Sequence, residues 1–360
     1  MSDGTDNFAE MWRWFSTHCR EYSPLYERIS LAVADDRELL ERVQAAPPSA
    51  HLPPALLAAV HYLLLEGADH PLGDVYGGRS DADPGPLFVD FCRAHRDAVM
   101  AILATRHMQT NECGRSAAIG PGLTWLASRL DGPFALIDVG ASAGLNLLCD
   151  RYRFDYGRHG ATGPAGSPVA ISCDVVGGDP PIAELLPPIS TRVGIDRSPI
   201  DLADPDDARW LLACVWPDTG RLERTAAAIT LAQGDPPRVV AGDANATLPG
   251  VLAALPLGAV AVVTTTWAFA YFSAEDRLAF MDLLDRASHQ RAIAWLSAEG
   301  AGTVEPFAAA RAADDEQGKS DILGAVIFQR GERRAHMLGY VQEHGAWIDW
   351  QATSSSPGGH

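Results

Sequence analysis

The sequence predicts an α/β protein, in which an α-helical N-terminal domain precedes a doubly wound, mostly parallel sheet with an antiparallel C-terminal hairpin. Three observations support this prediction. In residues 1–130 apolar side chains recur at helical spacings of three and four, without period-two alternation. From Phe134 onward, short apolar runs alternate with helix-like segments, which is typical of parallel strands covered on both faces. Near the C-terminus, two extended runs flank the turn "RGER".

The first 130 residues are predicted to be helical throughout. In "FAEMWRWFSTHC" the side chains of Phe8, Trp12, Phe15 and Cys19 share one helix face. The segment "RELLERVQAA" ends at two prolines, and "PPALLAAVHYLLLEGA" begins with two prolines, which suit the first turn of a helix. We therefore predict a helical domain over residues 1–130.

Five apolar runs after residue 131 are predicted to be strands of one sheet. They are "FALIDVG" (134–140), "TRVGID" (191–196), "PRVVAGDA" (237–244), "AVAVVTTTWAF" (259–269) and "RAIAWLSAE" (291–299). The Gly- and Pro-rich segment 157–190 interrupts this rhythm and is predicted to be an insertion, in which "RYRFDYG" and "SPVAISCDV" could pair as a small hairpin. The second domain is predicted to cover residues 131–353, followed by a disordered tail at 354–360.

Composition restricts the classes of function. The formal net charge of -18 and the isoelectric point near 4.9 disfavour binding to nucleic acid or to an anionic membrane surface. The start "MSDGTDNFAE" is unlike a signal peptide, and no apolar stretch reaches the length of a membrane span. Six scattered cysteines and the histidine spacing indicate neither a disulfide framework nor a metal site. We expect a cytoplasmic protein that acts on a small molecule.

The stretch "GASAG" (140–144) has two interpretations. In a hydrolase, Ser142 would be the nucleophile on a strained turn between strand and helix. Such an enzyme needs an acid and then a histidine later in the chain, and Asp243 or Glu299 with His336 or His344 would serve. Acids and histidines are common in a chain of 360 residues, so this match is not specific.

The alternative interpretation is a loop that cradles a cofactor. Gly140 and Gly144 would let the backbone approach a ligand and the following helix, whose free N–H groups favour an anionic group. Because everything before Phe134 is predicted to be helical, this is the first strand, whereas a hydrolase nucleophile normally follows several strands. The residues predicted to bind the cofactor at this loop are Asp138, Gly140, Ala141, Ser142, Gly144 and Asn146.

Two further strands also end in an aspartate. Asp196 would hold the ribose hydroxyls, since a carboxylate can accept two hydrogen bonds at once. Asp243, next to Ala244, would accept from the exocyclic amine of adenine. Three consecutive strands that each end in an aspartate favour the cofactor interpretation.

At these residues the chain resembles the class I S-adenosylmethionine-dependent methyltransferases, over about residues 134–350. "LIDVGASAGLN", "VGIDRSP" and "VVAGDA" resemble their first three motifs, "AVAVVTTTWAF" the strand that ends at the reacting methyl group, and the terminal hairpin is similar to their reversed last strand. The resemblance implies a Rossmann-like fold and S-adenosylmethionine as cofactor. It places Asp138, Gly140 and Gly144 around the methionine part, Asp196 at the ribose, and Asp243 with Ala244 at the adenine.

The chain departs from that family's pattern in two respects. Ser142 stands where the loop usually has its middle glycine, and Asp196 follows Gly144 by 52 residues. The insertion 157–190 would account for this long spacing, and Asp155 is then an alternative ribose ligand. More closely, "QTNECGRSAAIGPGL", "DVGASAGLNL" and "ACVWPD" resemble a bacterial family of unknown function that is grouped with this fold.

Substrate-binding residues are predicted in two segments. In "HMQTNECGRS" (107–116), Arg115 would bind a carboxylate through its planar guanidinium, and Asn111 and Glu112 would orient an amine; the alternative is a capped loop with Glu112 and Arg115 as a surface pair. In "TTTWAFAYFS" (264–273), Trp267 and Tyr271 are predicted to bind the substrate, and Thr266, which walls the same pocket, is predicted to bind the cofactor. Phe269 and Phe272 are predicted core aromatics.

The sequence hypothesis is methyl transfer from S-adenosylmethionine to a small molecule, with no catalytic base identified. Three alternatives stay open. They are a serine hydrolase that uses Ser142, a nicotinamide dehydrogenase that uses Asp196, and a non-catalytic protein that binds S-adenosylmethionine or another nucleotide. A further segment, "DHPLGDVYGG" (69–78), would be either a substrate loop using His70 and Tyr76 or an ordinary turn.

Overall fold

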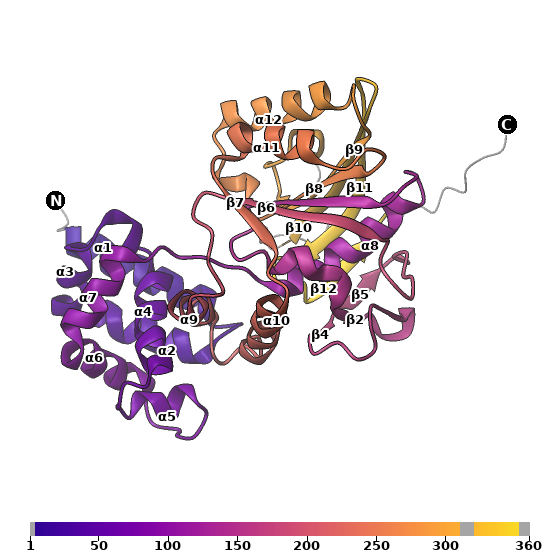
Figure 1. Cartoon of the computed structure of the whole chain (residues 1–360). Helices are drawn as coiled ribbons and strands as arrows, with labels where there is room; N and C mark the ends of the chain where they lie inside the picture. The colour runs from indigo at the N-terminus through magenta and orange to yellow at the C-terminus, as the bar shows by residue number, and fades with distance from the viewer. Residues whose placement is uncertain (1–3, 310–319, 353–360) are drawn as a thin grey trace. The chain divides into compact units, whose positions relative to one another are not determined.

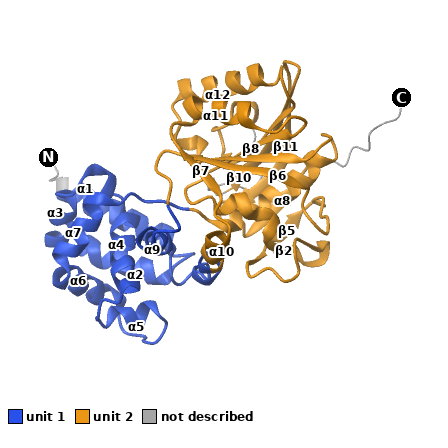
Figure 2. Cartoon of the chain, in the orientation of Figure 1, with its two compact units in different colours: residues 1–110, 201–226 blue, residues 111–200, 227–360 orange. Residues whose placement is uncertain are grey.

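The computed structural model describes residues 4–309 and 320–352. The chain divides into two compact units (Figure 2). Unit 1 comprises Met1–Thr110 and Asp201–Ala226, and unit 2 comprises Asn111–Ile200 and Ala227–His360. The predicted disordered tail 354–360 lies outside the described residues. Within those residues, every helix is too short or too polar to cross a bilayer.

Unit 1 is built from helices, as predicted for the N-terminal part of the chain (Figure 1). Several begin at a residue that caps free backbone amides: the Ser23 hydroxyl accepts from the Tyr26 N–H, and the Asp36 carboxylate from the Leu39 N–H. The helices are α1 (Gly4–Cys19), α2 (Pro24–Asp35), α3 (Arg37–Gln44), the 3-10 turn η1 (Pro48–Ala50), α4 (Pro53–Glu66), α5 (Leu72–Tyr76), α6 (Pro84–Ala94), α7 (Arg96–Thr105) and α9 (Pro205–Ala213). The boundary between the units falls inside α10 (Leu222–Gly234).

Unit 2 contains a nine-stranded sheet in the order β5-β12-β11-β10-β9-β8-β1-β6-β7. The five predicted strands form a continuous parallel part of it: β1 (Phe134–Val139), β6 (Ile189–Asp196), β7 (Arg238–Ala241), β8 (Val260–Thr266) and β9 (Ile293–Gly300). The remaining strands are β10 (Ser320–Gln329), β11 (Glu332–Gln342), β12 (Trp347–Trp350) and β5 (Asp174–Gly177). The prediction of an α/β protein with a mostly parallel sheet is confirmed.

The predicted C-terminal hairpin is also present, as β10 and β11. Both residues of its turn, Arg330 and Gly331, have positive φ, which matches the right-handed twist of the flanking strands. The hairpin extends the sheet from β9 by antiparallel pairing, and β12 then adds a third antiparallel strand. The strands β9 to β12 therefore form a simple antiparallel meander at this side of the sheet.

The order of the parallel strands creates a switch point between β1 and β8. From β1 the chain proceeds outward through β6 to β7, and it then returns to the other side of β1 as β8 and proceeds to β9. The connections that leave β1 and β8 therefore run in opposite directions. In open α/β sheets such a point leaves a crevice at the carboxyl ends of the two strands, where ligands bind.

Both faces of the sheet are covered. On one face, Ile137, Val263 and Trp295 belong to a buried cluster with side chains of α11 (Ala244–Ala254) and α12 (Ala274–Ala287). On the other face lies α8 (Ser116–Ala127), where Gly122 packs so closely on Leu296 that a Cβ would be 2.8 Å from its methyl groups. Figure 1 shows α11 and α12 on the side of the sheet opposite to α8.

The two units do not follow the predicted division at residue 130. Helix α8 belongs to unit 2 because it packs on the sheet. Helix α9 lies between β6 and β7 in the sequence but belongs to unit 1, where it packs against α4 and the Trp210 indole donates to the His107 carbonyl. Amphipathic periodicity identifies the apolar face of a helix, but it does not identify the surface that this face covers.

The segment predicted as an insertion folds into a small structure of its own. The strands β2 (Arg153–Asp155), β3 (Ala161–Thr162) and β4 (Ala170–Ser172) form a three-stranded sheet. The strands β2 and β4 are parallel, so they are not the two arms of a hairpin, and β3 is the antiparallel partner of β2. The segment then continues as β5, which pairs with β12 at the edge of the large sheet.

Replacement of Phe280 by alanine tests the core between the sheet and α12. Phe280 is fully buried and makes edge contacts with Phe269 and Trp295. We expect Phe280→Ala to lower the free energy of unfolding by about 3–5 kcal/mol in urea denaturation. The control is Leu257→Ala, because Leu257 is 97% exposed and its loss should change stability by less than about 0.5 kcal/mol. Similar effects of the two changes would contradict this description of the core.

Candidate functional site

The predicted cofactor loop follows β1 as a tight turn, called here the Ser142 loop (residues 140–144). Gly140 and Gly144 both have a φ of 79°, in the left-handed region that favours glycine. The N–H groups of Gly140 and Ala141 both donate to the Ile195 carbonyl, at 2.8 and 3.2 Å, so the loop folds back over the end of β6. Ser142 also has a positive φ, 52°, which is uncommon for a residue other than glycine.

Asp196, the predicted ribose ligand, holds this loop in place. Its Oδ2 accepts a hydrogen bond from the Ser142 N–H at 2.8 Å, and its Oδ1 accepts from the Ser198 N–H at 2.8 Å. Because Asp196 ends β6, next to β1 in the sheet, the carboxylate spans the ends of two strands. The strained conformation of Ser142 is therefore fixed by a neighbouring carboxylate.

The segment after the Ser142 loop is a short 3-10 segment, not the helix that the sequence predicts. The chain enters η3 (Leu145–Arg151), a seven-residue 3-10 segment with a kink at Leu148. The Leu145 N–H donates to the Asn111 side chain at 2.9 Å, and the Asn146 side chain accepts from the Ser116 hydroxyl at 2.8 Å. The array of free amides predicted to attract an anion is therefore not formed, because Asn111 occupies the first amide and the helix is too short.

A second strained turn lies beside the first, and we call it the Trp267 loop (residues 267–269). Trp267 has a φ of 59° directly after β8. Glu299, fully buried at the end of β9, accepts hydrogen bonds at Oε1 from the N–H groups of Ala268 and Phe269, at 3.1 and 2.9 Å. A Cβ on Gly140 would lie only 2.5 Å from the Ala268 Cβ, so the Ser142 and Trp267 loops are in direct contact.

Arg115 reaches the same end of the sheet from η2 (Cys113–Arg115). Its Nη1 donates to the Thr266 carbonyl at 3.0 Å and its Nε to the Glu343 carbonyl at 3.2 Å. Burial lowers the pKa of Arg115, and several carboxyl groups counteract this effect: Glu112, Glu299, Asp321 and Glu343. Glu112 is itself buried and its Oε1 accepts from the Gly114 N–H, so it is not half of an exposed surface pair.

Two buried aspartates complete the polar cluster. Asp138 accepts from the Thr264 hydroxyl at 2.8 Å, and burial raises the pKa of its carboxyl group to about 7. Asp321, at the start of β10, accepts from the Trp267 indole, and burial again raises its pKa to about 7. The sequence interpretation missed Asp321. The available signal was an acidic residue at the head of the apolar run "ILGAVIF".

Three of the predicted residues have other tasks. Asp243 caps α11 through the N–H groups of Asn245 and Ala246, and its Oδ2 accepts from Arg197 at 2.9 Å. Ala244 is the buried first residue of that helix. Tyr271 is 82% exposed on η5 (Phe269–Tyr271), whereas Phe269 lies in the core as predicted, with Phe272 packed against it.

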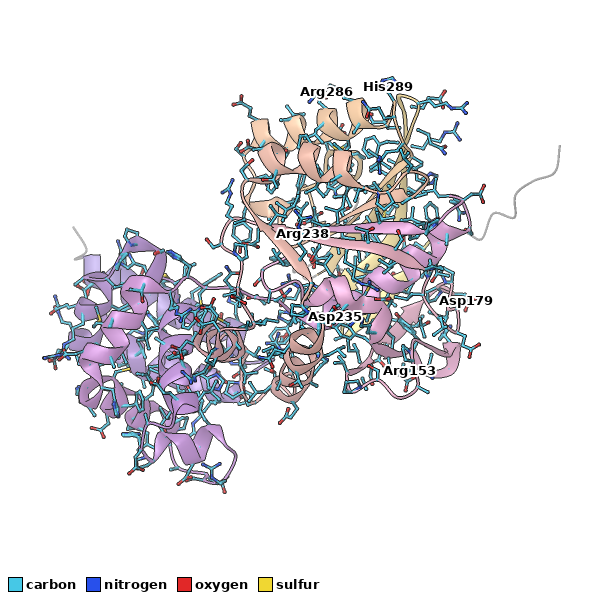
Figure 3. The ribbon with its side chains drawn as sticks, in the orientation of Figure 1. Arg153, Asp179, Asp235, Arg238, Arg286 and His289 are labelled. Atoms are coloured by element: carbon cyan, nitrogen blue, oxygen red, sulfur yellow. The ribbon has the colours of Figure 1, made fainter. Side chains whose placement is uncertain are left out.

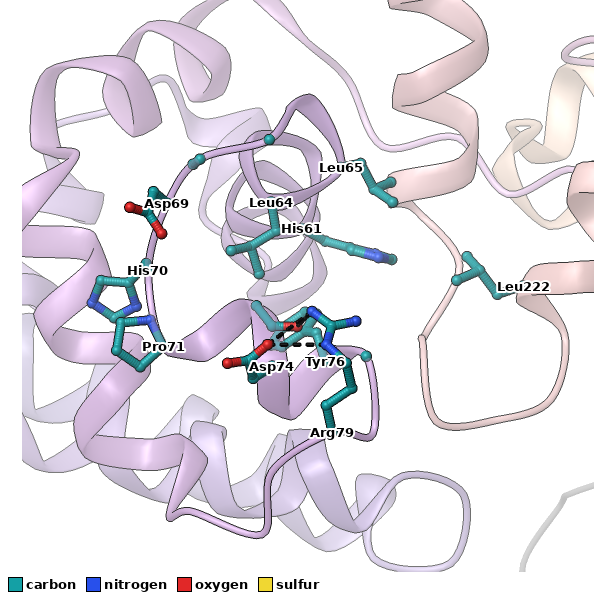
Figure 4. Close-up of a pocket in the computed structure, with 14 residues that line it drawn as sticks. His61, Leu64, Leu65, Asp69, His70, Pro71, Asp74, Tyr76, Arg79 and Leu222 are labelled. Atoms are coloured by element: carbon teal, nitrogen blue, oxygen red, sulfur yellow. Dashed lines mark hydrogen bonds and ion pairs between the residues drawn. The ribbon is translucent and has the colours of Figure 1, made fainter.

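The alternative ligands lie elsewhere. Asp155 belongs to the three-stranded sheet, where its Oδ1 accepts from the Gly157 N–H. His70 and Tyr76 line a cavity of about 790 Å³ within unit 1, and the Asp74–Arg79 ion pair lines it next to Tyr76 (Figure 4). Figure 3 labels Arg286, in the last turn of α12, and His289, which follows that helix and precedes β9.

The described residues do not form the triad of a serine hydrolase. The Ser142 Oγ is buried and has no hydrogen-bond partner among them. His336 lies in β11, four strands from β1, which corresponds to about 19 Å at the usual spacing of neighbouring strands. Its ring packs on Trp125, with 5.0 Å between the ring centroids. His344 follows β11 in the turn toward β12.

A metal site is also not evident in the part of the chain that the structure describes. The described residues do not gather three His, Cys, Asp or Glu side chains that could hold a metal ion.

Replacing Gly140 tests the contact between the two loops. In Gly140→Ala the new methyl group would meet Ala268, in addition to the strain of a positive φ. Gly258→Ala is the matched control, because Gly258 has a φ of 83° and open space at the Cβ position. We expect Gly140→Ala to reduce the free energy of unfolding by about 1–3 kcal/mol more than the control does. Equal losses in urea denaturation would show that the loops are not in tight contact.

Asp138→Asn tests the buried carboxyl group through pH. The unfolded chain loses this proton above about pH 4, whereas the folded protein keeps it up to about pH 7. Between these values the unfolded state binds fewer protons, so the carboxyl group lowers wild-type stability as pH rises. Asn retains an oxygen that can accept from Thr264 and does not titrate. The gain in unfolding free energy of Asp138→Asn over wild type should therefore grow from pH 4 to pH 7 and then level off. A gain that does not change with pH would contradict this.

Comparison with known proteins assigns the chain to a family. Residues 9–350 match the family described as "Uncharacterized protein conserved in bacteria (DUF2332)", and the protein belongs to this family. The resemblance to a bacterial family of unknown function is thereby confirmed. A comparison with curated proteins finds no significant match.

Proposed function

We propose that this family member binds S-adenosylmethionine at the carboxyl ends of β1 and β8 and transfers its methyl group to a small molecule. One observation carries the proposal: two turns that each contain a residue with strained backbone, Ser142 in one and Trp267 in the other, touch through Gly140 and Ala268 at the switch point of the sheet. Strained residues persist only where the surroundings hold them, and they concentrate at ligand clamps and active sites.

The charges near the two loops suit this cofactor. S-adenosylmethionine carries a positive sulfonium, an ammonium and a carboxylate. The carboxyl groups of Asp138, Glu299 and Asp321 make the surroundings acidic, which favours a cation, and Arg115 is the cation among them. Arg115 donates to two carbonyl oxygens, those of Thr266 and Glu343, and a guanidinium has five N–H donors, so others remain for a ligand carboxylate.

Asp196 is the residue that we assign to the ribose. Both oxygens already accept one backbone N–H, but a carboxylate can accept about four hydrogen bonds in all. Asp196 can therefore hold the Ser142 loop and a ribose hydroxyl at once. Asp243 stays the residue predicted for the adenine: its two oxygens accept from the α11 cap and from Arg197, and by the same count its carboxylate can accept a further hydrogen bond.

The chemistry requires little from the protein beyond alignment. S-adenosylmethionine supplies a methyl group that its sulfonium charge has already activated. The chain's own residues then have to bind, orient and exclude water. Thr266 and Trp267, at the end of β8, are the residues that would border the reacting groups. Tyr271 is too exposed to share this task unless it moves.

A titration with S-adenosylhomocysteine tests the cofactor assignment. We expect wild type to bind it in isothermal calorimetry, and NAD to bind far less. Asp196→Asn should weaken binding by at least about tenfold, because it removes the charged acceptor and loosens the Ser142 loop. Asp155→Asn is the matched control, since Asp155 also ends a strand but belongs to the small sheet.

The outcomes separate the alternatives. Absence of binding at millimolar S-adenosylhomocysteine would overturn the cofactor assignment. Equal affinities of the Asp196 and Asp155 variants would remove Asp196 from the site. Binding without methyl transfer to amine, hydroxyl and thiol acceptors would favour a non-catalytic binding protein.

A further inference from the structure

The Ser142 hydroxyl is the one polar group of its residue that lacks a partner. The Ser142 N–H donates to Asp196, and its carbonyl accepts from the Ile200 N–H at 3.3 Å. The side chain is 3% exposed, and its Oγ has no hydrogen bond with any described residue. A buried hydroxyl without a partner is costly, and it needs an explanation when it persists.

A serine at this position also lowers the stability of the fold, because its backbone has a positive φ. The φ of 52° is one that glycine adopts freely and that costs other residues about 1–2 kcal/mol. Glycine would remove both the strain and the unpaired hydroxyl, and the two neighbouring positive-φ residues of the loop, Gly140 and Gly144, are glycines. Neither local geometry nor local packing therefore accounts for a serine.

We propose that the Ser142 hydroxyl binds the ligand, through a hydrogen bond to a polar atom of an adenosyl compound, and that it makes the loop selective for ligands that offer this atom. This inference rests on the proposed function. The hydroxyl lies in the loop that Asp196 clamps, so it is held within the assigned ribose site. A hydrogen bond formed there is shielded from water, which strengthens it relative to one at the surface.

Two variants separate the effect of the hydroxyl on ligand affinity from the effect of the backbone strain on stability. Ser142→Ala removes the hydroxyl and keeps the strain, whereas Ser142→Gly removes both. We expect both to bind S-adenosylhomocysteine about tenfold more weakly than wild type in calorimetry. Ser142→Gly should nevertheless raise the urea midpoint, because it relieves the positive φ.

Arg330→Gly is the matched control. Arg330 has a φ of 53° in the β10–β11 turn and lies apart from the two loops. Its replacement should raise the urea midpoint in the same way and leave the affinity for S-adenosylhomocysteine unchanged. A weaker affinity confined to the Ser142 variants would support the inference.

Three results would overturn the inference. Wild-type affinity in Ser142→Ala would show that the hydroxyl does not touch the ligand, while the proposed function would stand. Covalent labelling of Ser142 by a serine-reactive phosphonate would make it a nucleophile instead. Failure of wild type itself to bind S-adenosylhomocysteine would overturn the proposed function, and this inference with it.

Discussion

The contact between the loops that follow β1 and β8 is the constraint on which the candidate site depends. The two strands are neighbours in the sheet, and their connections leave in opposite directions, so their carboxyl ends are open to a ligand. Gly140 and Ala268 then bring the two turns into contact. Each turn contains a strained residue, and each is held by a carboxylate from an adjacent strand, Asp196 in one case and Glu299 in the other.

Buried carboxyl groups destabilise a fold, so proteins keep them mainly where they have a function. Asp138 and Asp321 both lie in surroundings that raise the pKa of their carboxyl groups, and the positive charge of Arg115 partly counteracts this for both. Their hydrogen bonds come from Thr264 and from the Trp267 indole. Natural proteins keep arrangements of this kind where ligands bind, because a binding site is shaped for its ligand rather than for stability.

Much of this arrangement could be predicted from the sequence. The residues whose roles could not be predicted have one feature in common: their partners or tasks do not follow from a local pattern. The five parallel strands, the hairpin around Arg330–Gly331 and the glycine loop after β1 are all local patterns, and each formed as predicted. Asp243 also caps α11, a task that the sequence did not reveal because an aspartate after a strand suits either a ligand or the cap of the next helix. Asp321 was missed because its partner Trp267 is distant in sequence, so no local pattern links them.

The sequence by itself determined the five parallel strands, the C-terminal hairpin and the turn chemistry, because hydrophobic periodicity and glycine placement depend on neighbouring residues alone. Only the tertiary structure decided which helices belong to which unit and that Arg115 reaches the end of β8. It alone also decided that two carboxylates clamp two strained turns. These features depend on strand order and on contacts between residues far apart in the chain, which no local pattern encodes.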